Sequence, residues 1–170
     1  GESSGLWSVL RSSEDEVLKG SLLITLYENL RWKTISPQGF REEMLAYLPN
    51  ESNSLLFSMA LSYLGDCQRI FPSDSRPLEQ VLWKIVTTNP VSQHRLQAFR
   101  LYRSIADSEE AVQRLYTLWQ ERKAPKDCTL SESDYIGLSY MLAIHLPEKA
   151  DKIIATQLSR IQNPDRKKEY

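Results

Sequence analysis

Apolar residues recur every three or four positions along most of the chain, which is the spacing of one face of an α-helix. Residues 108–123, for example, carry Val112, Leu115 and Trp119 at this spacing. No segment alternates apolar and polar residues in the way that a half-buried strand does. The pattern therefore predicts an all-α fold.

Helix-start signals divide the pattern into about eight helices. Such signals occur at Ser13/Glu16, Ser36/Pro37, Asn89/Pro90, Ser108 and Ser131/Asp134, where a side chain can cap free backbone N–H groups or Pro fits the first turn. The predicted helices cover approximately residues 14–31, 36–48, 51–67, 77–88, 90–106, 108–123, 131–146 and 147–161. Residues 1–12 are expected to form an irregular entry segment.

The arrangement of these helices follows from the short loops between them, which favour antiparallel neighbours. Stacked helix pairs of roughly 35–45 residues form an α-solenoid. The pairs share no sequence repeat, so residues 1–170 are predicted to be a single domain, an irregular solenoid of the HEAT or armadillo type. Helices 51–67 and 131–146 are apolar nearly all round and are expected in its inner layer. Helix 14–31 is also expected to be well buried, with Gly20 permitting close packing.

The end of the chain carries one more helix-start signal, Asn163-Pro164, with few residues after it. We therefore expect residues 1–170 to be a fragment of a longer chain, with a closing helix truncated after Asn163. The face around Ile154, Leu158 and Ile161 is then expected to be partly uncovered and able to self-associate.

Composition narrows the classes of partner. The hydrophobic fraction of 41% and the charged fraction of 25% are ordinary for a globular chain. The net charge of -1 gives no electrostatic reason to expect nucleic acid or an anionic membrane. The longest apolar run, residues 136–146, is too short to span a bilayer. Cys67 and Cys128 are expected to be free thiols, although a disulfide between them stays open.

Signals for catalysis are missing from the sequence. The two histidines, His94 and His145, do not make a zinc ligand set, and Pro147 interrupts the helix that would present His145 beside Glu148. There is no phosphate-binding loop and no Gly-x-Ser-x-Gly elbow. His94 is expected to be solvated. The four tryptophans, Trp7, Trp32, Trp83 and Trp119, are expected to pack in the core. The sequence thus predicts no catalytic and no metal-binding residue.

Three arginines on one predicted helix are the candidate binding residues. Arg95, Arg100 and Arg103 are spaced so that they could line a concave wall and contact a carboxylate or a phosphate. The simpler alternative is that they form salt bridges on the helix surface.

Three stretches of the chain, GSLLITLYENL (20–30), RLYTLW (114–119) with LSESDYIGL (130–138), and TQLSRIQNPDR (156–166), carry a resemblance to a known family. In order and spacing they resemble the C-terminal helical domain of some bacterial zinc aminopeptidases of the aminopeptidase N family. In that family a His-Glu-x-x-His helix and a further Glu bind zinc in an upstream catalytic domain. The motif is absent here, so the resemblance assigns no catalytic or zinc-binding residue to this chain.

The resemblance implies a role within a larger bacterial enzyme, cytoplasmic or exported, that uses zinc as its cofactor. The helical domain would pack against the catalytic domain of the same chain and limit which peptides reach the active site. In some relatives a basic residue of this domain contacts the carboxylate of the peptide substrate, a role for which Arg95, Arg100 and Arg103 are the candidates. A free-standing α-solenoid that binds a protein or peptide is the alternative, and an enzyme with its site inside this chain is a third hypothesis.

Overall fold

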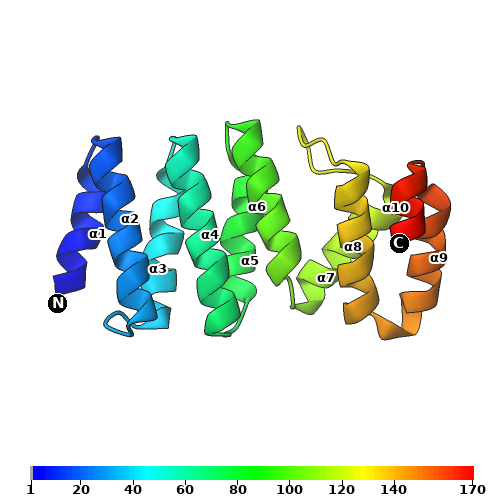
Figure 1. Cartoon of the computed structure of the whole chain (residues 1–170), viewed down its shortest axis with the longest axis horizontal. Helices are drawn as coiled ribbons and strands as arrows, with labels where there is room; N and C mark the ends of the chain where they lie inside the picture. The colour runs from blue at the N-terminus through cyan, green and yellow to red at the C-terminus, as the bar shows by residue number, and fades with distance from the viewer. Residues whose placement is uncertain (1) are drawn as a thin grey trace.

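The computed structural model describes residues 2–170, which contain ten α-helices and no strand (Figure 1). The helices are α1 (Glu2–Ser12), α2 (Glu16–Arg31), α3 (Pro37–Tyr47), α4 (Ser54–Ile70), α5 (Arg76–Thr88), α6 (Ser92–Ile105), α7 (Glu109–Glu121), α8 (Glu132–His145), α9 (Ala150–Arg160) and α10 (Pro164–Glu169), with short 3₁₀ helices η1 (Leu48–Asn50) and η2 (Pro147–Lys149). The predicted all-α fold is confirmed.

The helices stack as pairs in two layers. Helices α2, α4, α6 and α8 lie side by side in one row, each in contact with the next (Figure 1). Helix α1 packs against α2, α3 against α4 and α5 against α6, so that each pair is also adjacent in sequence. Helix α7 runs obliquely behind α8, which makes the stack irregular as expected. No helix in the described part of the chain is long and apolar enough to cross a membrane.

Side-chain caps fix most of the helix starts. Ser36 and Ser108 accept hydrogen bonds from backbone N–H groups of α3 and α7, and Ser131 forms the predicted capping box with Asp134 at α8. Two predicted starts were wrong. Asp15, rather than Ser13, caps α2, and Asn89 ends α5 instead of starting α6, because its side chain accepts a hydrogen bond from the N–H of Val91 outside the helix.

The predicted irregular entry segment is wrong, because α1 begins at Glu2 and Gly1 lies outside the described residues. Trp7 and Leu10, three positions apart, are buried on one face of α1. The Trp7 ring lies edge-on to Phe40 of α3, with ring centroids 5.7 Å apart. Packing of this short stripe against the first helices outweighs the low helix propensity of the Ser- and Gly-rich start.

Burial is less complete than the apolar content predicted. Helix α2 exposes Ile24 and 80% of Val17, although the sequence indicated a well-buried helix. Helices α4 and α8 do lie in the central row with neighbours on several sides, yet Leu55 and Ile144 face outward. A helix in this row is covered by its neighbours and by the second layer, but one side stays open.

One tryptophan does not follow the prediction of a core position. Trp32 lies after the end of α2 and is 77% exposed, so it does not pack in the core. The face of α9, in contrast, is as expected: Ile154 is partly buried and Leu158 is 38% exposed, while Ile161, which follows the helix, is buried. The α9 face is therefore partly uncovered, as predicted. Asn163 does cap a helix as predicted, since its side chain accepts two backbone hydrogen bonds at the start of α10.

Candidate functional site

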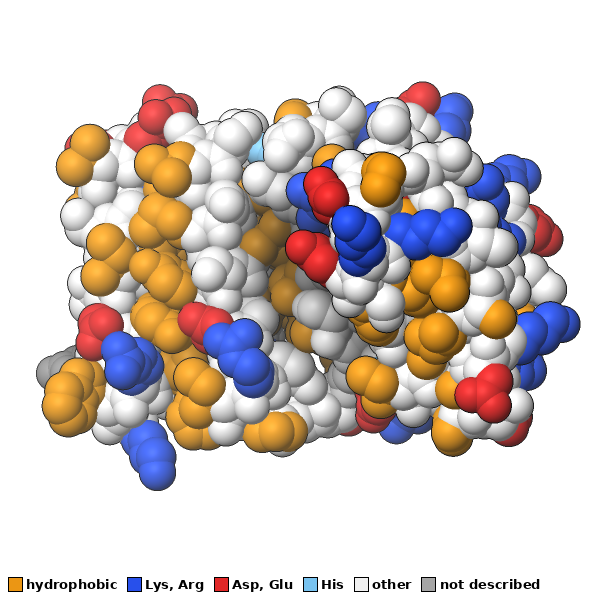
Figure 2. Space-filling model, turned by 45° about the vertical axis from the view of Figure 1, so that its right-hand side comes forward, with side chains coloured by type: hydrophobic (Ala, Val, Ile, Leu, Met, Phe, Trp, Pro, Cys, Tyr) orange, Lys and Arg blue, Asp and Glu red, His pale blue; other side chains and the backbone are white. Residues whose placement is uncertain are grey.

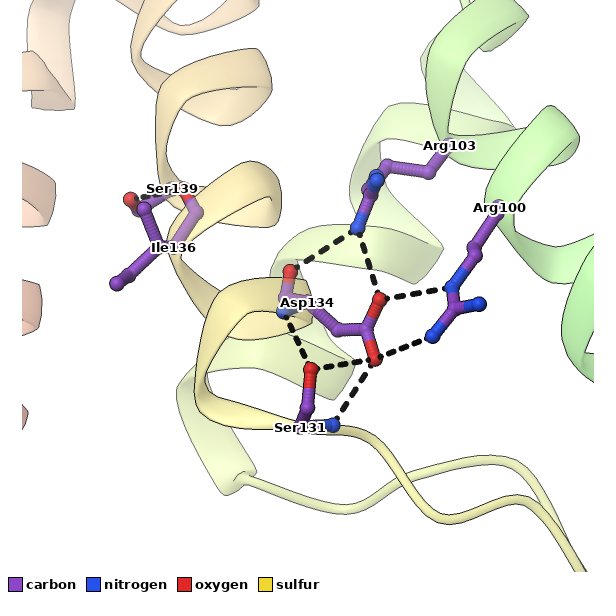
Figure 3. Close-up of polar contacts among 6 residues, drawn as sticks. All are labelled: Arg100, Arg103, Ser131, Asp134, Ile136 and Ser139. Atoms are coloured by element: carbon purple, nitrogen blue, oxygen red, sulfur yellow. Dashed lines mark hydrogen bonds and ion pairs between the residues drawn. The ribbon is translucent and has the colours of Figure 1, made fainter. Parts of the chain in front are cut away.

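Two of the three candidate arginines converge on one carboxylate. Arg100 and Arg103, on α6, both point at Asp134 in the first turn of α8 (Figure 3). Arg100 Nε and Nη2 donate to the two Asp134 oxygens at 3.1 and 3.3 Å. Arg103 Nη1 lies 3.2 Å from the Asp134 backbone carbonyl oxygen and 3.4 Å from Oδ1. The cluster joins α6 to α8 across the stack.

Asp134 holds this cluster together because it is buried and fully used as an acceptor. It is only 4% exposed, and the Ser131 N–H and hydroxyl donate to its Oδ2 at 2.9 and 3.0 Å. Burial by itself raises the pKa of Asp134, but the hydrogen bonds from Arg100 and Ser131 outweigh it and hold the pKa below its usual value. Asp134 is therefore ionised. It takes part in the capping box at the start of α8 and forms ion pairs with arginines of α6.

Gly137 makes room for this arrangement one turn further along α8. A Cβ atom at Gly137 would lie 3.0 Å from Cζ and Nη1 of Arg103, closer than most Cβ contacts in proteins. Burial lowers the pKa of the Arg103 guanidinium, and the Asp134 charge opposes this effect. The absent side chain thus lets a largely buried cation lie against the helix.

Arg95 lies apart from the other two. Its Nη1 is 3.4 Å from Oδ2 of Asp127 and 3.5 Å from the carbonyl oxygen of Lys126, in the loop before α8. The three arginines therefore do not form one row of free cations. Contact of any of them with a substrate carboxylate stays a prediction. Of the two arginines at Asp134, Arg100 has the more exposed side chain, at 46% against 22% for Arg103.

The two histidines lie in different surroundings. His94 is completely buried, which corrects the expectation of a solvated residue. Its ring stacks on Phe57 of α4, with ring centroids 4.1 Å apart, and its Nε2 is 3.1 Å from Ser54 Oγ. His145 Nε2 lies 3.5 Å from Asp107. Within residues 2–170 no group of three or more His, Cys, Asp or Glu side chains could hold a metal ion, and Cys67 and Cys128 are free thiols.

A pocket of about 550 Å³ lies where the starts of α5 and α7 meet. Glu79 forms its buried wall and accepts hydrogen bonds from the Ser75 hydroxyl and from the N–H groups of Asp107 and Ser108. Burial raises the pKa of Glu79, but the donors on Ser108 and Asp107 outweigh it, so the pKa is lowered. One ionised carboxylate thus anchors two helix starts.

Arg114 forms another part of this pocket and is also engaged. It donates to the Tyr102 hydroxyl at 2.9 Å and to Glu110 at 2.8 Å, and its guanidinium lies over the Trp83 ring at 4.7 Å. Because Glu79 and Arg114 are occupied by neighbours in the fold, their geometry favours a structural role at the α5–α7 junction.

Glu79 was not among the site residues predicted from the sequence. The signal was its place on the apolar face of α5, three residues before Leu82 and seven before Val86. A carboxylate on such a stripe must be buried with donors, which the loop before α7 supplies.

The chain was compared with known families, curated proteins and solved structures. No family model matches the chain, and neither a curated protein nor a solved structure matches it.

Proposed function

We propose that this chain is the helical domain of a zinc-dependent aminopeptidase. In this role it packs against the catalytic domain of the same polypeptide, covers the active-site chamber and limits the entry of peptides. Zinc and the reacting groups belong to the catalytic domain, and this chain has no catalytic role by itself.

The observation that carries the proposal is the stack of antiparallel helix pairs in which the three resembling stretches occur. Residues 20–30 lie in α2, residues 114–119 lie in α7, and residues 156–166 span the turn from α9 to α10. These segments lie mostly within helices of the stack, and only their ends reach into loops. The sequence resemblance therefore lies in residues that form the helices of the domain. Such a helical stack is the architecture that a wall of the active-site chamber requires.

The internal polar clusters also support a wall-forming role. Asp134, Glu79 and their cationic or hydroxyl partners satisfy one another and tie helices together. Such clusters stiffen the stack because each buried charge has its donors in place. A rigid wall can select peptides by size without contributing a reacting group.

The test is the reading frame upstream of this chain and the protein that it encodes. The proposal expects a His-Glu-x-x-His motif upstream, about one zinc per full-length protein, and hydrolysis of an aminoacyl-p-nitroanilide by that protein. A reading frame that lacks the motif, or one equivalent of zinc bound to residues 1–170 alone, contradicts the proposal.

A free-standing peptide- or protein-binding stack is the second candidate, favoured by apolar residues on the open side of the central row. Val17 and Ile24 are one heptad apart on α2 and both exposed, and Leu55 is exposed on the neighbouring α4. Hydrophobic side chains also form rows over the left-hand part of the face in Figure 2. Exposed apolar surface of this kind marks interaction sites in other proteins.

The two candidates differ in what covers this surface. In the first, a domain of the same polypeptide covers it, so Ile24→Glu in the full-length protein lowers its stability. In the second, a separate partner covers it, so one partner is recovered with residues 1–170 and lost with Ile24→Glu. The control is Lys33→Glu, a charge change at an exposed position after the end of α2.

A further inference from the structure

A small pocket lies where the end of α7, the start of α8 and the body of α9 meet. Its volume is about 130 Å³, and its lining includes Arg122, Tyr135, Gln157 and Arg160. At about 30 Å³ for each water, this is space for roughly four water molecules. The pocket therefore fits one small chemical group and excludes a nucleotide base or a bulky side chain.

Gln157 presents a donor at the base of this pocket. The residue is only 1% exposed, and its Oε1 accepts a hydrogen bond from Trp119 Nε1 at 2.8 Å. Because the indole nitrogen is always a donor, it fixes which end of the Gln157 amide faces Trp119. The amide nitrogen Nε2 is then directed away from Trp119, and it has no hydrogen-bond partner among the described residues.

Arg160 is held rigidly at the side of the pocket. Its Nη1 and Nη2 donate to the carbonyl oxygens of Trp119 and Gln120 at the end of α7, at 2.9 and 3.0 Å. Its guanidinium also lies over the Trp119 ring, 4.8 Å from the centroid. Its charge is not paired with a carboxylate among the residues that the structure describes.

Arg122 supplies the second cation from an unusual backbone position. It follows α7 in the left-handed conformation, with φ 53° and ψ 38°, where Gly is the favoured residue. Its side chain forms no ion pair or hydrogen bond within residues 2–170. The left-handed backbone of Arg122 is unfavourable, and no contact of its side chain within the described residues offsets that strain.

Neither Arg122 nor Arg160 forms an ion pair among the described residues, although the carboxylate of Glu132 also lines the pocket. Burial lowers the pKa of Arg160, and the like charge of Arg122 lowers it further. Burial raises the pKa of the Tyr135 phenol, whereas Arg122 and Arg160 oppose that rise, so both cations act on the phenolic oxygen. The carboxylate of Glu132 is occupied by the Gln162 N–H at 2.8 Å and by Arg166 at 3.1 Å.

We propose that this pocket binds a small oxyanion, the carboxylate or phosphate group of a ligand, through Arg122, Arg160 and the Gln157 amide. Two guanidiniums and an amide N–H₂ provide donors of the kind that bind oxyanions, and the one carboxylate of the lining, Glu132, is already paired with Arg166. Tyr135, which also lines the pocket, carries a hydroxyl that can donate. This site is separate from Arg95, Arg100 and Arg103, and it does not depend on the proposed aminopeptidase role.

The experiment is a titration of residues 1–170 with sodium phosphate and, separately, with sodium acetate, with sodium chloride at matched ionic strength as reference. The readouts are the side-chain amide NMR signals of Gln157 and the thermal midpoint. We expect saturable shifts of the Gln157 signals and a raised midpoint with at least one of the two anions. Tighter binding of phosphate identifies a phosphate ester as the source of the group, and tighter binding of acetate identifies a carboxylate.

The deciding variant is Arg122→Gly, which removes the guanidinium and relieves the left-handed strain, so its folding is not in question. The control is Lys33→Gly, which removes a cation at another left-handed position, φ 60°. We expect binding about tenfold weaker in Arg122→Gly and unchanged in Lys33→Gly. Equal binding by Arg122→Gly and the original chain, or no saturable Gln157 shift with either anion, overturns the proposal.

Discussion

The guanidinium of Arg103 packs directly against Gly137: a Cβ atom at Gly137 would lie 3.0 Å from the guanidinium carbon of Arg103. The Arg103 side chain is held there by the Asp134 carboxylate and backbone carbonyl. Gly20, in contrast, has ordinary room, since a Cβ there would lie 3.6 Å from Leu56. The close approach expected at Gly20 is therefore found at Gly137.

Alanine at these two glycines is expected to have opposite effects. Gly20→Ala gains helix propensity and raises the free energy of unfolding by about 0.5–1 kcal/mol. Gly137→Ala gains the same propensity but displaces a charge-assisted hydrogen bond, for a net loss of about 1 kcal/mol. Urea denaturation followed by circular dichroism measures both. A higher free energy of unfolding for Gly137→Ala would show that the Arg103 side chain can move without losing stabilising interactions.

Asp134→Asn removes the charge that Arg100 and Arg103 share. We expect the free energy of unfolding to fall by about 2–4 kcal/mol, because a buried cation loses its counter-charge. The control is Asp74→Asn, since Asp74 pairs with Arg76 on the surface and its loss has little effect. Chemical denaturation at pH 7 measures the free energy of unfolding of both variants. Equal losses would mean that the ion pairs of Asp134 stabilise the fold no more than a surface ion pair does.

Acid also acts through Asp134. Its pKa is lowered in the folded state, so its contribution is complete above the ordinary carboxyl pKa, about 3.9, and is lost as the pH falls through the folded pKa. The difference in stability between the original chain and Asp134→Asn should therefore shrink below about pH 4. A difference that stays constant down to pH 2 would contradict this linkage.

His94 is expected to make the chain sensitive to mild acid. Burial lowers the pKa of His94, while the Glu51 charge, which is paired with Lys19, opposes the shift. The unfolded chain then binds the proton more readily, so stability is complete above about pH 6.5 and falls as the pH drops toward the folded pKa.

His94→Phe tests this by removing the titrating group while keeping an aromatic ring against Phe57. It also removes the buried Nδ1, which has no hydrogen-bond partner in the described part of the chain. We expect a gain of about 1 kcal/mol at pH 7 and a flatter stability profile between pH 7 and 5. His145→Gln serves as the control at the other histidine. An unchanged slope in His94→Phe would exclude His94 as the source.

Self-association through α9 stays a prediction, and Leu158 is the residue that tests it. Its side chain is 38% exposed next to the partly buried Ile154. Sedimentation equilibrium should show a concentration-dependent dimer that Leu158→Glu abolishes and Ile144→Glu, at an exposed position on α8, does not. A monomer at every concentration, or equal effects of the two changes, would exclude this face.

The parts of the fold that the sequence predicted well are those controlled by local interactions. Helix α7 combines a four-residue apolar stripe with a serine cap, and both signals lie within one segment. Helix α1 was not predicted because its stripe consists of little more than Trp7 and Leu10, which are buried only through contact with α2 and α3.

The candidate site was predictable only in part, because its partners are distant in sequence. Arg100, Arg103 and Ser131 were each noticed, yet their common partner Asp134 was recognised only as a capping acid, 34 residues from Arg100. His94 lies in a polar first turn, so its burial depends on how α6 meets α4. Nothing within α6 itself carries that information.

The pairing of helices that are neighbours in sequence has a consequence for how this chain opens and closes. Each helix of the central row packs against the helix that precedes it in sequence, so ordering such a pair closes only a short loop. Folding can then spread along the row from any interior pair, and opening starts at the ends. Amide hydrogens of α1 and α10 should exchange with solvent first, and those of α4 and α6 last.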